Sequence, residues 1–150
     1  MRRLTLIASW IMMAAAVMGC DDRGDNYLDG SLVKNYNISF KSVRARLSST
    51  QLAIEYVKDD VAALRITLNI DEVTPKSGGT YDLAAHGSVT RYGDFGTLPG
   101  IESGELTFDA YSETDGKEIS GDFHGKFVSD SGSTQSLKGA FKTKLEVTPL

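Results

Sequence analysis

The sequence predicts an all-β domain of about eight antiparallel strands. Through most of the region from Tyr36 to Leu145, apolar and polar residues alternate with a period of two, the pattern of strands with one buried face. Apolar residues there do not recur at spacings of three and four, so amphipathic helices are not expected. Clusters of Gly, Asp, Ser and Pro separate the alternating runs. A meander of these strands would form a two-sheet sandwich or an up-and-down barrel, and the sequence leaves both open.

The N-terminal half contains four alternating runs, which predict strands over residues 36–40, 43–47, 52–56 and 64–70. The first two runs alternate in opposite phase, so a bulge or bend is expected around Lys41 and Ser42. A turn is expected at Lys58-Asp59-Asp60, between the third run and the fourth.

The middle of the chain predicts two short strands, around residues 81–83 and 88–92, followed by a loop over residues 93–100. The last third predicts three consecutive antiparallel strands over residues 104–110, 119–127 and 137–145. Gly121 and Gly139 occupy inward positions in the last two of these strands. Because glycine has no side chain, we expect these positions to leave room for a neighbouring ring or to allow a local bend.

The inward positions of the predicted strands give the expected hydrophobic core. It includes Ile38, Phe40, Ile54, Ile66, Leu68, Leu106, Phe108, Phe123, Phe127, Phe141 and Leu145.

The first 20 residues have the organisation of a secretory signal. Arg2 and Arg3 precede an apolar stretch over residues 4–17, and Val17-Met18-Gly19-Cys20 follows with a small residue directly before the cysteine. The apolar stretch is shorter than the roughly 20 residues that span a bilayer. The motif resembles the lipobox of bacterial lipoproteins, with Met18 as its one mild departure.

The resemblance implies a signal peptide over residues 1–19 that is removed, leaving Cys20 as the N-terminus with a diacylglycerol on its sulfur and, usually, an acyl chain such as palmitate on its amine. Residues 20–31 are then expected to be a lipidated cysteine and a flexible acidic tether, and residues 32–150 a single β domain. The expected location is a bacterial membrane, with the domain in the periplasm or at the cell surface. Asp21 and Asp22 resemble inner-membrane retention signals in some lineages and surface-export signals in others, so the membrane face stays open.

Composition narrows the functional classes. The chain carries 16 Lys and Arg against 20 Asp and Glu, and loss of Arg2 and Arg3 would leave 14 − 20 = −6. This balance gives no reason to expect nucleic-acid binding. Cys20 is the single cysteine, so lipidation would leave no thiol for a disulfide. The two histidines, His86 and His124, do not have a metal-ligand spacing, and no metal or cofactor is expected.

One group of basic residues stands out in this acidic chain. It lies at outward positions of the last two predicted strands and consists of His124, Lys126, Lys138, Lys142 and Lys144. Such a group is typical of a solvated strand face that also discourages edge pairing. The functional alternative is contact with anionic headgroups or another envelope polyanion.

Alternation also places Ser120, Asp122 and His124 on one strand face, but no oxyanion-stabilising group or shielded pocket accompanies them in the sequence. The chain is therefore not expected to be an enzyme. The favoured interpretation is a membrane-anchored envelope lipoprotein that presents a β domain to a protein or surface partner. The alternative is a calycin-like carrier that holds one small ligand in a barrel cavity. The sequence does not specify an oligomeric state.

Overall fold

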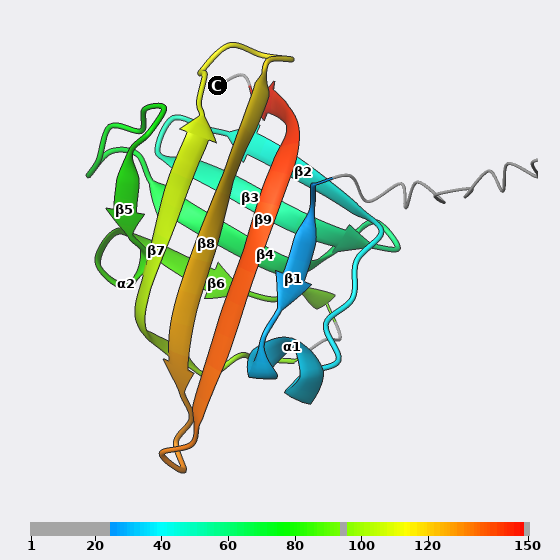
Figure 1. Cartoon of the computed structure of the whole chain (residues 1–150). Coiled ribbons are helices and arrows are strands. Elements are labelled where there is room, and N and C mark those ends of the chain that lie inside the picture. Colours follow the sequence, from blue (N-terminus) through cyan, green and yellow to red (C-terminus); the bar gives the residue numbers. More distant parts are fainter. Residues whose placement is uncertain (1–24, 94–95, 149–150) are drawn as a thin grey trace, which may run out of the picture.

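The computed structural model describes residues 25–93 and 96–148, which form a nearly closed barrel around one core. Predicted features before Asp25, including the signal peptide and Cys20, lie outside the described residues. The all-β prediction is confirmed. The strand order is β5-β7-β8-β9-β2-β3-β4-β6, and β1 additionally pairs with β9. In Figure 1, the strands of the front sheet (β5, β7, β8, β9, β1) cross those of the back sheet (β2, β3, β4, β6) obliquely.

Most predicted strands are present; the long ones extend beyond their predicted bounds, whereas the two short ones in the middle of the chain are shifted by a residue or shortened. The strands are β2 (Ser42–Leu47), β3 (Gln51–Lys58), β4 (Val61–Asn69), β5 (Thr80–Asp82), β6 (Gly87–Thr90), β7 (Gly100–Ala110), β8 (Glu118–Val128) and β9 (Thr134–Val147). Neighbouring strands pair antiparallel except β2 and β9, which are parallel, with Ala45 opposite Leu145. The prediction of a purely antiparallel meander is therefore wrong at this one junction, where the last strand joins the first long strand.

The N-terminal segment differs from its prediction. Residues 27–31 were expected within a flexible tether, but Tyr27–Asp29 forms β1 on the edge of β9, and α1 (Ser31–Asn35) follows it. The strand expected over residues 36–40 is absent because Asn37 takes a left-handed conformation (φ 49°) directly after the helix. Ile38 and Phe40 are nevertheless buried, and the predicted bend at Lys41 and Ser42 is the point where β2 begins.

A second short helix, α2 (Leu83–His86), was also not expected, because residues 81–83 read as a strand. It connects β5 with β6, the two ends of the strand order, and its Leu83 is fully buried. The side chain of Asp82 caps it, since Oδ1 accepts hydrogen bonds from the amides of Ala84 (2.8 Å) and Ala85 (3.1 Å). The helix therefore covers the place where the barrel is not closed by strand pairing.

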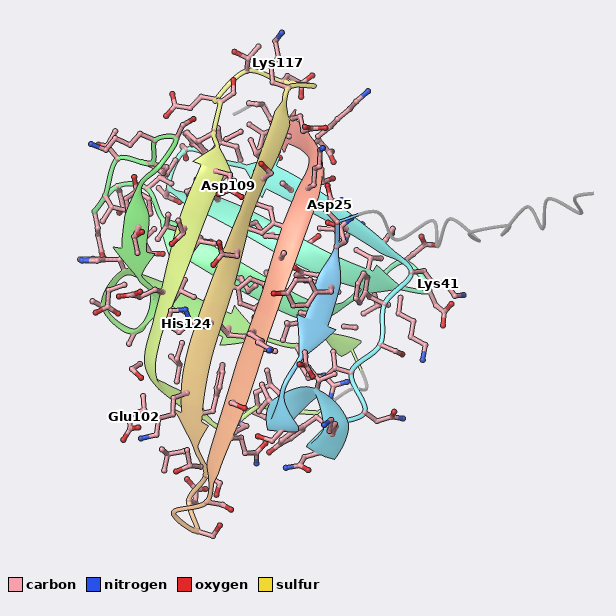
Figure 2. All side chains as sticks on the ribbon, in the orientation of Figure 1. Asp25, Lys41, Glu102, Asp109, Lys117 and His124 are labelled. Atoms are coloured by element: carbon pink, nitrogen blue, oxygen red, sulfur yellow. The ribbon has the colours of Figure 1, made fainter. Side chains whose placement is uncertain are left out.

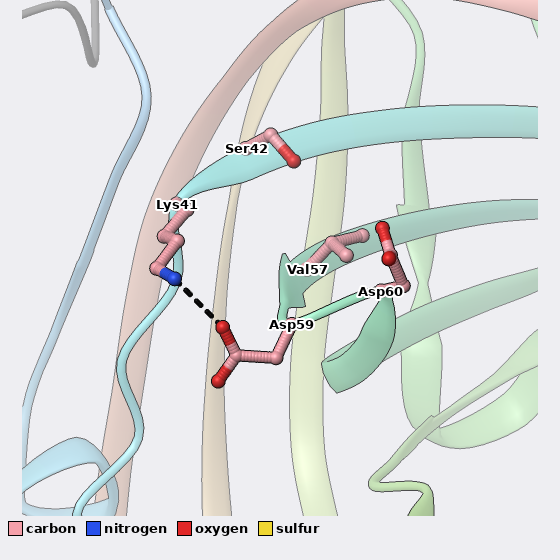
Figure 3. Close-up of a pocket in the computed structure, with 5 residues that line it drawn as sticks. All are labelled: Lys41, Ser42, Val57, Asp59 and Asp60. Atoms are coloured by element: carbon pink, nitrogen blue, oxygen red, sulfur yellow. Dashed lines mark hydrogen bonds and ion pairs between the residues drawn. The ribbon is translucent and has the colours of Figure 1, made fainter.

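Charged side chains lie on the outside of the barrel. Figure 2 labels Asp109 and His124 on the outer face of the front sheet and Lys41 at the margin of the back sheet. The predicted turn between β3 and β4 is confirmed at Asp59 and Asp60, both with positive φ. Beside it lies a shallow depression of about 280 Å³, spanned by a 2.7 Å ion pair between Lys41 Nζ and Asp59 Oδ1 (Figure 3).

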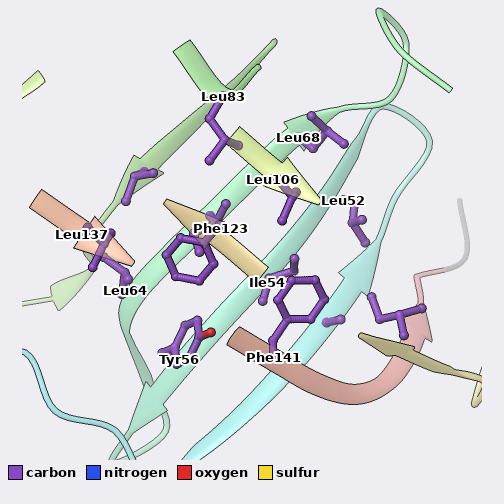
Figure 4. Close-up of a cluster of buried hydrophobic side chains, with 14 of the residues drawn as sticks. Leu52, Ile54, Tyr56, Leu64, Leu68, Leu83, Leu106, Phe123, Leu137 and Phe141 are labelled. Atoms are coloured by element: carbon purple, nitrogen blue, oxygen red, sulfur yellow. The ribbon is translucent and has the colours of Figure 1, made fainter. Parts of the chain in front are cut away.

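The predicted core is confirmed in full, because all eleven of its residues are buried. The two sheets meet through aromatic contacts at Tyr56, whose ring centroid lies 4.9 Å from that of Phe40 and 5.9 Å from that of Phe123. Figure 4 shows Tyr56, Phe123 and Phe141 side by side among leucines of both sheets. The interior is thus filled by large side chains.

Gly121 and Gly139 leave room for rings, as predicted. They are the register partners of Phe141 and Phe123 respectively, so each glycine lies across from a ring on the adjacent strand. A Cβ built on Gly139 would lie 2.6 Å from Phe123 Cζ, and one on Gly121 would lie 3.0 Å from Phe141 Cζ. The repeated glycine and phenylalanine spacing of β8 and β9 therefore encodes reciprocal packing between the two strands.

Candidate functional site

The five predicted basic residues lie on one outer face, which we call the lysine face. Alternation along β8 places His124 and Lys126 outward, and alternation along β9 does the same for Lys138, Lys142 and Lys144. His124 is the register partner of Lys138. The five basic residues are therefore at outward positions of the last two strands, as the sequence predicted.

Acidic residues from neighbouring segments divide the positive charge of the lysine face. Three lysines are in ion pairs, which are Lys126–Glu102 (2.5 Å), Lys138–Asp29 (3.4 Å) and Lys142 with Asp25 (3.6 Å) and Glu118 (3.7 Å). His124 Nε2 lies 3.8 Å from a carboxylate oxygen of Glu105. The side chains in these pairs are about half exposed or more, so each pair contributes little, typically below about 1 kcal/mol. The lysine face therefore has mixed charge. The sequence did not reveal this because the acidic partners belong to other strands.

A depression of about 260 Å³ brings together His124, Lys126 and Lys138. Ser136 contributes to its lining and is tied to α1, because its amide donates a 2.9 Å hydrogen bond to Ser31 Oγ. Chemically, the depression could receive a small anion. Such an anion would compete with the carboxylates of Glu102, Glu105 and Asp29 for the same cations.

Ser120, Asp122 and His124 stay in a line along β8, with Lys142, Ala140 and Lys138 as their partners on β9. Ser120 and His124 are four residues apart on an extended strand, so their Cα atoms are separated by about 13 Å. The side chain of His124 is 62% exposed. The arrangement does not converge on a reacting atom.

A second charged cluster lies on the outer face of the back sheet. Arg44 on β2, Glu55 on β3 and Arg65 on β4 are aligned in register across three adjacent strands. The carboxylate of Glu55 has no exposed surface and accepts from Arg65 Nε (2.6 Å) and from Arg44 Nε. Arg65 Nη2 pairs with the same carboxylate. A single buried carboxylate thus holds two guanidinium groups over the sheet.

Tyr92, which follows β6, extends this cluster. Its hydroxyl accepts a 2.6 Å hydrogen bond from Arg65 Nη1, and the guanidinium carbon of Arg65 lies 3.9 Å from the centre of its ring. The contact combines a hydrogen bond with a cation–π interaction, which fixes the plane of the guanidinium. Tyr92 is still 44% exposed, so the contact lies at the surface.

The two arginines determine the ionisation of Glu55. Burial by itself raises the pKa of this carboxyl group, but the hydrogen bond from Arg44 and the charge and hydrogen bond of Arg65 outweigh burial. The net result is a pKa below the ordinary value for glutamate. Glu55 is therefore ionised at neutral pH, and the cluster of Arg44, Glu55 and Arg65 carries one net positive charge.

Part of the guanidinium surface on β2 has no partner among the described residues. Arg44 donates to Glu55 through Nε, and its two terminal nitrogens make no hydrogen bond to a described residue. Arg46, two residues further on the same face, has a buried Nε without a hydrogen bond to the described chain, and the nearest carboxylate oxygen, from Glu146, is 3.6 Å away. We call the outer surface of Arg44, Arg46, Glu55, Arg65 and Tyr92 the arginine face.

Sequence reasoning did not identify the arginine face, although it placed Arg44 and Arg46 outward. The available signal was Glu55, a charged residue between the core residues Ile54 and Tyr56. Its burial depends on the register that sets Arg44 and Arg65 on either side, and the sequence does not give that register.

Two further properties concern the described chain only. Residues 25–93 and 96–148 contain no group of three or more His, Cys, Asp or Glu side chains arranged to hold a metal ion. In the same ranges, no helix has the length and apolar character needed to cross a membrane. Comparison with known proteins adds no relative: we found no matching family model, no matching curated protein and no matching solved structure.

Proposed function

We propose that this chain is an exported lipoprotein of the bacterial envelope, anchored by lipid on Cys20, and that it acts by binding rather than by catalysis. The observation that carries the anchor is the order Val17-Met18-Gly19-Cys20 after a basic and apolar leader. Lipid on both the sulfur and the amine would hold the protein firmly, since each buried methylene contributes about 0.8 kcal/mol.

The first residues of the barrel limit the distance between the proposed anchor and the domain. Asn26 is already part of the barrel, because its Oδ1 accepts a 2.6 Å hydrogen bond from the amide of Lys142. Residues 21–25 then separate the anchored cysteine from the domain, and five residues span at most about 18 Å. The β1 end of the barrel would lie close to the lipid headgroups.

The filled interior favours binding at the outer surface over carriage of a ligand inside the barrel. Tyr56, Phe108, Phe123, Phe127 and Phe141 are among the largest fully buried side chains. None of them lines the two depressions described above or two others of about 390 and 140 Å³, whose walls are formed largely by surface residues around Leu98. A carrier would need a cavity where these rings now lie.

Labelling with a palmitate analogue in a Gram-negative host tests the anchor. The full chain should incorporate the label and sediment with membranes, whereas Cys20→Ser should do neither, because Cys20 is the chain's single cysteine. Met18→Ala serves as a matched control that keeps the cysteine and should still be labelled. An unlabelled wild-type chain, or a labelled Cys20→Ser chain, would refute the proposed anchor. Fractionation of the labelled cells identifies the membrane.

A further inference from the structure

The two outer faces of the barrel differ in composition. On the lysine face, three exposed lysines pair with exposed Glu and Asp side chains of neighbouring segments. The arginine face carries Arg44, Arg46, Arg65 and the exposed ring of Tyr92, and its one central acid, Glu55, is buried. Surfaces that bind proteins are enriched in Arg and Tyr and depleted in Lys, Glu and Asp. In composition, the arginine face therefore resembles a protein-binding surface more than the lysine face does.

Apolar exposure points to the same face. Tyr27, Val61 and Tyr92 are the exposed large hydrophobic residues of the described chain. Tyr92 lies against Arg65 and joins β4 through its amide, which donates to Ala62 O (3.2 Å). The register shift between β3 and β4 separates Val61 from Arg65, so Tyr92 is the exposed hydrophobic residue that belongs to the arginine face. Apolar contacts beside fixed arginines are typical of residues that dominate binding energy.

Two of the three arginines, Arg44 and Arg65, are held in place within the protein itself. Glu55 holds Arg44 and Arg65, and Tyr92 fixes the remaining terminal nitrogen of Arg65. A partner would lose less side-chain entropy here than on free lysines, because the guanidinium groups are held in place. Arg44 and Arg46 occupy alternate positions on the outer side of β2, about 6.6 Å apart along the strand, and their side chains are partly exposed.

We propose that the arginine face binds an acidic, extended segment of a protein partner, with carboxylates at alternate residues that accept from Arg44 and Arg46. The spacing of the donors on β2 equals the spacing of side chains on one side of an extended chain. Apolar side chains of the segment would pack on Tyr92, whose ring is 44% exposed. This inference rests on the proposed binding role and does not depend on the lipid anchor.

Other occupants fit less well. Arg44, Arg46 and Arg65 are offset by Glu55 and Glu146, which leaves 3 − 2 = +1 on the face. Recognition of anionic lipid typically uses clusters of about four to eight basic residues. A two-fold pairing of two copies through this face would set like charges against each other. An acidic protein segment satisfies both the charge and the exposed ring of Tyr92.

The test uses the full chain, ¹⁵N-labelled in nonionic detergent, titrated with a synthetic peptide of alternating Glu and Val. Amide shifts should concentrate on Arg44–Arg46, Glu55, Arg65 and Tyr92. Arg46→Gln lies outside the Glu55 cluster, so its fold should be intact, and with Arg44→Gln added the affinity should fall about tenfold or more. Lys142→Gln, on the lysine face, is the matched control and should leave affinity unchanged.

Several results would overturn the inference. Amide shifts that map to the lysine face, or equal binding of a Lys-Val peptide, would contradict it. So would unchanged affinity in a folded chain that carries both Arg44→Gln and Arg46→Gln. Shifts on the arginine face with anionic vesicles but not with the Glu-Val peptide would indicate a lipid occupant instead. The spectrum of each variant reports whether it is folded. Because the peptide is added in detergent, failure of lipidation at Cys20 would not alter its binding, so the two proposals fail separately.

Discussion

The hydroxyl of Tyr56 donates a 2.6 Å hydrogen bond to the main-chain carbonyl of Ala140, joining the back sheet to the front sheet through the core. Tyr56 lies on β3 and Ala140 on β9, and these two strands are not neighbours in the strand order. Burial raises the pKa of Tyr56 far above its ordinary value, so the hydroxyl keeps its proton and acts as a donor. The bond satisfies a polar group in a region otherwise filled by aromatic rings.

Loss of this one hydroxyl should destabilise the fold. Tyr56→Phe keeps the ring contacts with Phe40 and Phe123 but leaves the Ala140 carbonyl without this donor, so the free energy of unfolding in urea should fall by about 1–3 kcal/mol. Tyr27→Phe is the control, because Tyr27 is 47% exposed and should change stability little. Equal stability of the two variants would mean that water replaces the hydroxyl without loss.

The Glu55 cluster predicts a dependence of stability on pH. The pKa of Glu55 is lowered in the folded protein, so its stabilising contribution is complete above the ordinary glutamate pKa of about 4.5. That contribution is lost as the pH falls through the lower folded-state pKa, where the carboxylate takes up a proton. Relative to Glu55→Gln, the wild-type chain should be more stable by about 1–3 kcal/mol at neutral pH.

Urea unfolding at a series of pH values measures this difference. The gap between wild type and Glu55→Gln should be constant from about pH 6 to 8 and should narrow below about pH 4.5. Glu118→Gln is the matched control, since its carboxylate is 58% exposed and pairs only at the surface. A gap that is the same at pH 3 and pH 7 would contradict the assigned role of the carboxylate.

A methyl group at position 139 should be tolerated poorly. A Cβ on Gly139 would lie 2.6 Å from both Phe123 Cζ and the carbonyl oxygen of Tyr27, so β1 or the Phe123 ring must move. Gly139→Ala should therefore lower the free energy of unfolding by about 1–3 kcal/mol. Gly100→Ala is the control, because nothing lies within 4 Å of its built Cβ. A loss at Gly100 equal to that at Gly139 would show that the ring contact is not the cause.

Period-two alternation correctly predicted the features that depend on a single strand and its immediate partner. It identified the buried residues and the glycines that face Phe123 and Phe141, because side-chain direction follows directly from the pleat. It also gave the burial of Ile38 and Phe40 correctly, although those residues lie outside any strand. The alternation there predicted a strand that does not form, because Asn37 is left-handed, but the two apolar side chains still face the core.

The remaining features depend on contacts between distant segments. The short acidic stretch before α1 reads as a tether, yet Tyr27 pairs with Ala140, more than a hundred positions later. Glu55 reads as a solvated residue, yet Arg44 and Arg65 bury it once the register of three strands is set. The candidate site was therefore largely hidden in the sequence, because its charge and burial arise from pairing across strands.

The turn between β3 and β4 offers a stabilising substitution. Its two residues, Asp59 and Asp60, have φ values of 51° and 64°, the left-handed conformation that two-residue hairpins of this kind require at both positions. Glycine is favoured at the second position, because it reaches positive φ without the steric penalty of a side chain. Asp59 also pairs with Lys41, so Asp60 is the better site.

Asp60→Gly should raise the free energy of unfolding by up to about 1 kcal/mol, the relief of the left-handed strain less the entropy that glycine adds to the unfolded chain. Asp130→Gly is the matched control. Asp130 lies in the turn between β8 and β9 and is not among the residues with positive φ, so glycine there relieves no strain and should lower stability slightly. If both substitutions shift the urea midpoint in the same direction, the backbone conformation at Asp60 is not the source of the effect.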